Sequence, residues 1–201
     1  MTLREPRKPS YKQASKDALF LILRPLVRWL SIMRVRPDTL TVIGWTLALF
    51  SAVLFGLGYA RIAGAVMLFG GLFDALDGAV ARESNRMSSF GAFLDSTLDR
   101  LSESAVFVGL IFYYASSARP YEALLAAVAM TFSLLTSYAR ARAEGLNIDC
   151  KVGLLERAGR VVILSVFSIV GLPTVGLGLL AAGALVTTAQ RILHVRRASR
   201  G

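Results

Sequence analysis

FDALDGAVARESNRMSSFGAFLDSTLDR, residues 73–100, places four aspartates in segments that are otherwise apolar, and this arrangement constrains how the chain can fold. Asp74 and Asp77 are three residues apart, and Asp95 and Asp99 are four apart. At either spacing two side chains share one face of a helix. An ionised carboxylate costs about 2.5–3.5 kcal/mol in the middle of a membrane helix, so all four need compensation. If the two helices pack side by side, the carboxylates converge.

The four aspartates predict a metal site built from oxygen ligands. Carboxylate oxygens suit hard divalent cations such as Mg²⁺ and Mn²⁺. Four carboxylates carry enough charge for two ions per active site, an arrangement found at many phosphoryl-transfer sites. Two alternatives use the same residues: internal salt bridges to arginines such as Arg82 and Arg100, or a cation relay in a transporter.

The regions around this stretch are apolar enough to cross a membrane several times. Of the 201 residues, 55% are hydrophobic, and the mean hydropathy is +0.57. Crossing a hydrocarbon core of ~30 Å takes ~20 apolar residues. We therefore predict an all-α membrane protein with a bundle of six transmembrane helices, at roughly 40–59, 62–81, 90–115, 122–142, 159–171 and 173–193.

Residues 1–36 precede this bundle as a basic segment that ends in an amphipathic helix. Leu23, Leu26 and Leu30 recur with helical spacing, and Arg24 and Arg28 lie between them. This pattern predicts a helix lying in the membrane interface. The six-helix domain then occupies residues 37–201.

The net charge of +10 is distributed unevenly between the two predicted sides of the membrane. In the loops opposite the termini, only Arg61 and Arg119 are basic. Because basic loops stay in the cytoplasm, both termini and the aspartate site are predicted on the cytoplasmic side of the cell membrane. Nucleic acid is not a predicted partner, because the basic residues flank apolar segments. With one cysteine, Cys150, and one histidine, His194, neither an intrachain disulfide nor a histidine-based zinc site is expected.

The small residues of the opening stretch distinguish between these alternatives. Gly78 and Ala81 leave room for a nucleotide beside the helix, Arg82 can pair with a phosphate, and Gly91 permits close approach. Eight residues match every fixed position of the signature of the CDP-alcohol phosphatidyltransferases, which this chain therefore resembles: Asp74, Asp77, Gly78, Ala81, Arg82, Gly91, Asp95 and Asp99. At ~5% background usage per residue, such a match arises by chance about once in 10¹⁰ starts.

The resemblance implies roles for individual residues. The four aspartates would bind the metal ions, and Asp99 would also be the general base that accepts the proton of the attacking hydroxyl. VRPDTLT, residues 35–41, resembles a family segment that helps to hold the CDP group. The residues implied to bind the CDP-lipid are Pro37, Asp38, Thr41, Gly78, Ala81, Arg82, Ser88 and Gly91. The resemblance also implies a homodimer.

The segment 137–164, SYARARAEGLNIDCKVGLLERAGRVVIL, indicates the acceptor alcohol. It resembles the inositol-phosphate branch of the family, the phosphatidylinositol phosphate synthases and archaetidylinositol phosphate synthases. The resemblance implies transfer of a phosphatidyl or archaetidyl group from a CDP-linked lipid such as CDP-diacylglycerol to myo-inositol phosphate, with release of CMP. Guanidinium groups at three helix ends would bind the acceptor phosphate, with Arg140, Arg160 and Arg191 favoured and Arg142 and Arg157 beside them.

Other readings of these residues remain open at this point. The arginines would serve only as positive-inside anchors if they face lipid headgroups. Glycerol phosphate and free inositol are alternative acceptors, although the signature lacks the proline and lysine typical of phosphatidylglycerophosphate synthases. A non-enzymatic cation-binding membrane protein is the alternative from another class.

Overall fold

The computed structural model describes residues 23–33, 35–84 and 88–200, and nearly all of them are helical. A helix of residues 23–32 comes first. Six further helices follow: α2 (Pro37–Gly56), α3 (Ala60–Glu83), α4 (Ser89–Ser116), α5 (Pro120–Glu144), α6 (Arg157–Ile169) and α7 (Pro173–Ala198). Pro37, Pro120 and Pro173 begin three of them, at the position where the missing N–H costs nothing.

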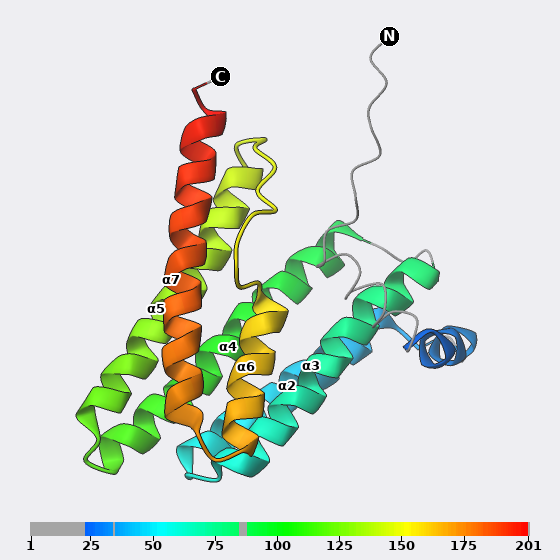
Figure 1. Ribbon diagram of the computed structural model, residues 1–201. Coiled ribbons are helices and arrows are strands. Elements are labelled where there is room, and N and C mark those ends of the chain that lie inside the picture. Colours follow the sequence, from blue (N-terminus) through cyan, green and yellow to red (C-terminus); the bar gives the residue numbers. More distant parts are fainter. Residues whose placement is uncertain (1–22, 34, 85–87, 201) are drawn as a thin grey trace.

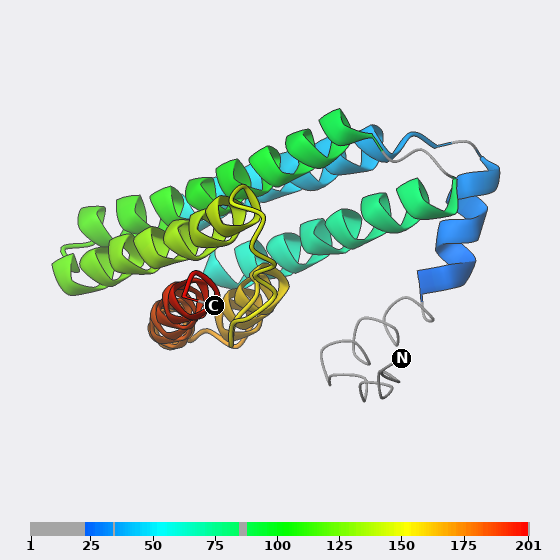
Figure 2. The same cartoon turned by 90° about the horizontal axis from the view of Figure 1, so that it is seen from above.

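The six helices α2–α7 form a ring in which each packs against two others. The neighbouring pairs are α2 with α3, α3 with α6, α6 with α7, α7 with α5, α5 with α4, and α4 with α2 (Figures 1 and 2). Three short turns, at 57–59, 117–119 and 170–172, lie at one end of the ring. The longer connection between α5 and α6 lies at the other end, where the aspartates are.

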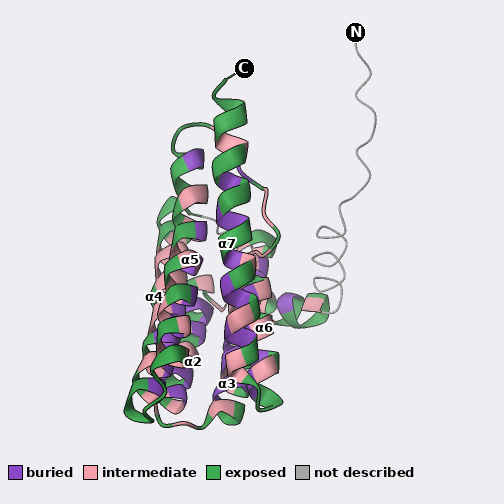
Figure 3. Cartoon of the chain, turned by 60° about the vertical axis from the view of Figure 1, so that its left-hand side comes forward, coloured by how far each residue is buried: buried purple, intermediate pink, exposed green. Residues whose placement is uncertain are grey.

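The main hydrophobic core lies toward the end with the short turns. Phe55, Phe107, Leu110, Tyr114 and Leu177 are all buried there. Buried residues face the interior of the ring, and exposed residues cover its outside (Figure 3). The core therefore holds one end of the ring together and leaves the aspartate end to polar side chains.

The backbones of α2 and α4 approach each other closely at Gly109. A Cβ on Gly109 of α4 would lie 2.2 Å from the carbonyl oxygen of Ala52 in α2. Only glycine allows the two helices to approach this closely. The contact fixes α4, and with it Asp95 and Asp99, relative to α2.

The prediction of six transmembrane helices is wrong, although the chain is an all-α membrane protein. Four helices, α2, α3, α5 and α7, are long and apolar enough to cross a membrane. The 13 residues of α6 span only about 20 Å of the ~30 Å required. The 28 residues of α4 are long enough, but charged side chains at Asp95, Asp99, Arg100 and Glu103 interrupt its apolar character.

The helix of residues 23–32 runs across the ends of α2 and α3 instead of along them (Figures 1 and 2). Val27 is buried in a small cluster with Leu40, Leu76 and Val80. Trp29, Ile32 and Met33 are exposed, and Arg24 and Arg28 are exposed as well. These features fit the predicted interfacial helix, and its place in a membrane stays a prediction. Residues 1–22 and 34 of the predicted N-terminal segment lie outside the described residues.

Candidate active site

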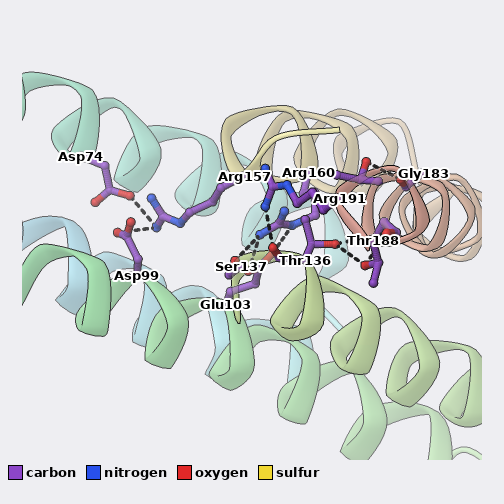
Figure 4. Close-up of polar contacts among 12 residues, drawn as sticks. Asp74, Asp99, Glu103, Thr136, Ser137, Arg157, Arg160, Gly183, Thr188 and Arg191 are labelled. Atoms are coloured by element: carbon purple, nitrogen blue, oxygen red, sulfur yellow. Dashed lines mark hydrogen bonds and ion pairs between the residues drawn. The ribbon is translucent and has the colours of Figure 1, made fainter. Parts of the chain in front are cut away.

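Asp74 of α3 and Asp99 of α4 both form ion pairs with Arg157 inside the ring. The Nη2 atom of Arg157, at the start of α6, lies 2.8 Å from Asp74 Oδ2 and 2.8 Å from Asp99 Oδ1 (Figure 4). All three side chains are partly buried, so solvent screens their charges only incompletely. The position between the two carboxylates therefore favours a positive charge.

Asp77 and Asp95 lie on the side of the site that faces α2. Asp77 is buried, and its Oδ2 accepts a hydrogen bond of 2.6 Å from the Thr41 hydroxyl. Asp95 is one helical turn before Asp99 and lines the cavities on both sides of it. Helices α3 and α4 thus direct all four aspartates toward one region. They do so without packing side by side, because α2 lies between them in the ring.

The chemistry of these groups fits a hard divalent cation, because all four acidic side chains are carboxylates. The guanidinium of Arg157 already places a positive charge between Asp74 and Asp99. Within the described residues, however, no three acidic side chains are placed to hold one ion. The ligand set therefore stays a prediction, as does the number of ions.

Gly44 of α2 was not singled out from the sequence, yet its Cα borders Asp74 closely: a Cβ there would lie 2.8 Å from Asp74 Oδ1.

A cleft between the ends of α2, α3 and α4, here named the α2–α3–α4 cleft, has a volume of about 190 Å³. All eight residues predicted to bind the CDP-lipid line it. Ser88 begins α4 as its N-cap, and its Oγ accepts a hydrogen bond of 2.9 Å from the backbone N–H of Gly91. The lining is formed by Pro37, Asp38, Thr41, Asp77, Gly78, Ala81, Arg82, Ser88, Gly91, Ala92 and Asp95.

A second and larger cavity, of about 430 Å³, lies on the other side of Asp95 and Asp99 and is here named the arginine cavity. Four of the five arginines predicted to bind the acceptor phosphate line it: Arg140, Arg157, Arg160 and Arg191. Arg142 is exposed on α5 and does not line the cavity. Residues two apart on an α-helix lie on nearly opposite faces, which separates Arg142 from Arg140.

Two of these arginines are held firmly by the protein. Arg160 of α6 is only 1% exposed and forms a bidentate pair with Glu103 of α4, with Nε–Oε1 and Nη2–Oε2 distances of 2.7 and 2.9 Å (Figure 4). Arg191 of α7 donates from Nε to the Val152 carbonyl at 3.0 Å and from Nη1 to the Thr136 carbonyl. Both guanidinium groups are therefore fixed before any ligand binds.

Glu103 was not predicted from the sequence. The available signal was its position four residues after Asp99, which places both side chains on one face of α4. Arg140, by contrast, pairs with Glu144 at 2.8 Å on its own helix, and both side chains are largely exposed. Its guanidinium is free to reorient toward a ligand.

The chain is similar to a known family of proteins. The family model described as CDP-alcohol phosphatidyltransferase matches residues 34–190. A phosphatidylinositol phosphate synthase of Mycobacterium tuberculosis is 36% identical over 189 residues, covering 89% of this chain and 87% of that protein. An archaetidylinositol phosphate synthase of Methanothermobacter thermautotrophicus is 36% identical over 165 residues, covering 79% and 82%.

The fold is also similar to solved structures. The crystal structure of the Mycobacterium tuberculosis phosphatidylinositol phosphate synthase with CDP-DAG bound aligns with a TM-score of 0.77 and 34% identity, covering 85% of this chain and 92% of that one. A crystal structure of the same enzyme in complex with manganese and citrate aligns with the same TM-score and covers 85% and 87%.

Proposed function

Because the chain belongs to the CDP-alcohol phosphatidyltransferase family, we propose that it transfers a phosphatidyl or archaetidyl group from a CDP-linked lipid to myo-inositol phosphate and releases CMP. The observation that carries this proposal is the position of Asp95, which lines both the α2–α3–α4 cleft and the arginine cavity. A cleft lined by small residues on one side of the aspartates and an arginine-lined cavity on the other would provide separate sites for donor and acceptor.

We assign the CDP group of the donor to the α2–α3–α4 cleft. Gly78, Ala81 and Gly91 line it with small side chains, and Arg82 supplies a guanidinium for the pyrophosphate. Thr41, Pro37, Asp38 and Ser88 complete the cleft and are assigned to the same ligand.

The lipid chains of the donor have a separate path to the site. An apolar groove of about 680 Å³ runs between α3 and α6 on the outside of the ring and reaches Asp74 and Arg157. Leu68, Phe69 and Val161 are among its lining residues. The groove would allow a lipid to enter sideways from the bilayer, with its chains in an apolar environment and its pyrophosphate beside the aspartates.

Asp74, Asp77, Asp95 and Asp99 are the residues that would hold divalent ions, which we propose to be two Mg²⁺ or Mn²⁺. When bound, such ions neutralise the pyrophosphate and stabilise the charge of the departing CMP. A manganese complex of the Mycobacterium tuberculosis relative supports a metal-dependent reaction.

Asp99 is assigned as the general base because it lines the arginine cavity and not the α2–α3–α4 cleft. It would accept the proton of an acceptor hydroxyl. That oxygen forms a bond to the lipid-side phosphorus, and the bond from this phosphorus to the CMP oxygen breaks. The arginines Arg140, Arg157, Arg160 and Arg191 would hold the phosphate of the acceptor and so position its ring hydroxyl.

The acceptor is proposed from two supports. The arginine cavity offers fixed guanidinium groups, which suit a phosphorylated alcohol better than a neutral one. The relatives are named as synthases of phosphatidylinositol phosphate and archaetidylinositol phosphate. Glycerol phosphate has the same charged group and is therefore the second candidate acceptor.

The proposal is tested by CMP release from CDP-diacylglycerol by the purified protein in detergent with Mg²⁺. Myo-inositol phosphate, free inositol and glycerol phosphate are compared as acceptors, and an ether-linked donor is run in parallel. We expect release with inositol phosphate and not with free inositol. Release with glycerol phosphate or free inositol alone would reject the proposed acceptor and keep the family chemistry.

We also propose a cytoplasmic location for both termini and the active site, and a homodimeric assembly. The distribution of basic residues supports the first, and the resemblance to the family supports the second. Protease accessibility of terminal tags in sealed vesicles tests the sidedness. Native mass spectrometry in detergent tests the dimer, and a monomeric mass would reject it.

A further inference from the structure

We propose that Glu103 is a positioning residue for the acceptor: it holds the Arg160 guanidinium in the orientation that binds the acceptor phosphate. The role of Glu103 rests on the proposed function, because it assumes a phosphorylated acceptor in the arginine cavity.

Glu103 and Arg160 form one of two parallel ion pairs between α4 and α6. The other is Asp99 with Arg157. The two acids are four residues apart on α4, and the two arginines are three apart on α6. Neither helix is the other's neighbour in the ring, so these pairs connect its opposite sides across the interior (Figure 4).

The two pairs differ in what surrounds them. Asp99 and Arg157 are partly exposed, and the Nη2 atom of Arg157 is shared between ion pairs with Asp99 and Asp74. Glu103 and Arg160 are 7% and 1% exposed, and they satisfy each other through two hydrogen bonds. The first pair can exchange partners during the reaction, whereas the second is built to stay in place.

The geometry of the buried pair leaves one edge of the guanidinium for a ligand. Glu103 accepts from Nε and Nη2, and the Ser137 hydroxyl lies 3.4 Å from the same Nη2. Nη1 is the nitrogen outside the pair, and Arg160 lines the arginine cavity. Because the guanidinium is planar, the two hydrogen bonds to Glu103 also fix the direction in which Nη1 can donate. A donor with a fixed direction is what recognition of a phosphate requires.

A competing explanation makes a different prediction. If Glu103 only offsets the charge of clustered arginines, its removal leaves the cavity more cationic and strengthens phosphate binding. If Glu103 positions Arg160, its removal lets the guanidinium turn away and weakens binding of the acceptor alone. The direction of change in the KM for inositol phosphate therefore distinguishes the two.

The experiment compares Glu103→Gln, Glu103→Asp and wild type in the CMP release assay, with both KM values, kcat and the melting temperature measured. The matched control is Glu122→Gln, which removes an exposed pair with Arg119 at the opposite end of the ring. We expect Glu103→Gln to raise the KM for inositol phosphate about tenfold or more, because it loses a charge-assisted hydrogen-bond pair. The KM for CDP-diacylglycerol should change by less than about twofold.

Glu103→Asp keeps the charge and should give a smaller rise, while Glu122→Gln should match wild type. An unchanged or lowered KM for inositol phosphate in either Glu103 variant would overturn the proposal. A rise in both KM values, accompanied by a fall in kcat and in melting temperature, would also overturn it, because that combination marks a purely structural pair. If Glu103→Gln does not fold, the proposal is tested by the same comparison of the two KM values in Glu103→Asp. Failure of wild type to use inositol phosphate would instead reject the proposed function.

Discussion

Gly44→Ala is expected to displace Asp74 without unfolding the protein. The added Cβ would lie 2.8 Å from Asp74 Oδ1, and ordinary van der Waals contact begins at 3.4 Å, so the carboxylate must move by about 0.6 Å. The closest atom is the end of a side chain, which can move more easily than backbone, and the backbone carbonyl oxygen of Gly70, at 3.3 Å, is only slightly closer than ordinary contact. Displacing a catalytic group by ~1 Å costs about 10²-fold in rate, so we expect kcat to fall by roughly 10- to 100-fold.

The assay is CMP release with both substrates saturating, alongside the melting temperature in detergent. The control is Gly178→Ala in α7, where a Cβ meets nothing within 4 Å. Both substitutions favour a helix by about 1 kcal/mol, so neither should lower the melting temperature through helix propensity. A Gly44→Ala enzyme with wild-type kcat, or an equal loss in Gly178→Ala, would refute the placement of Asp74 against α2.

Three further predictions follow from single contacts. Gly109→Ala forces α2 and α4 apart and should lower the stability by about 2 kcal/mol or more, seen as a drop in melting temperature that Gly178→Ala does not show. Thr41→Val removes the hydroxyl that donates to Asp77 and should raise the KM for the CDP-lipid by about fivefold, with the KM for the acceptor as the internal control. Chelation of divalent ions should abolish CMP release and leave the helical circular dichroism intact, because Arg157 supplies a cation to two aspartates. Arg157→Gln should therefore lower the melting temperature of the chelated protein more than that of the Mn²⁺-loaded protein, and equal shifts would contradict this role.

The residues that line the α2–α3–α4 cleft were anticipated from the family resemblance, because helix spacing relates side chains only within one helix and this cleft is lined by three helices. Pro37, Thr41, Gly78 and Gly91 all line it as expected. Their binding roles stay predictions.

The number of spans was predicted wrongly because apolar runs do not show where charged side chains point. The first half of α4 directs Asp95 and Asp99 into the ring. Helix α6, from Arg157 to Ile169, is as short as the predicted segment 159–171 and cannot cross a membrane. Hydropathy measures composition along the chain, and it does not distinguish a lipid-facing helix from one that lines a polar cavity.

Pairing between distant residues was also beyond sequence reasoning. Arg160 was predicted to be a ligand for phosphate, but its buried partner Glu103 is 57 residues away in the chain. Charge alone offers many acidic partners for each arginine. Only the ring arrangement of α4 and α6 selects this one, and it leaves Arg142 on the outside.

The ion pair between Arg157 and Asp74 has a consequence for biosynthesis. The two residues are separated by 83 positions, so at 5–20 residues per second the aspartate leaves the ribosome about 4 to 17 seconds before its counter-charge exists. During that interval α3 and α4 carry carboxylates with no arginine from α6 to neutralise them. We therefore expect the acidic segments of α3 and α4 to stay hydrated until the C-terminal half of the chain has been synthesised.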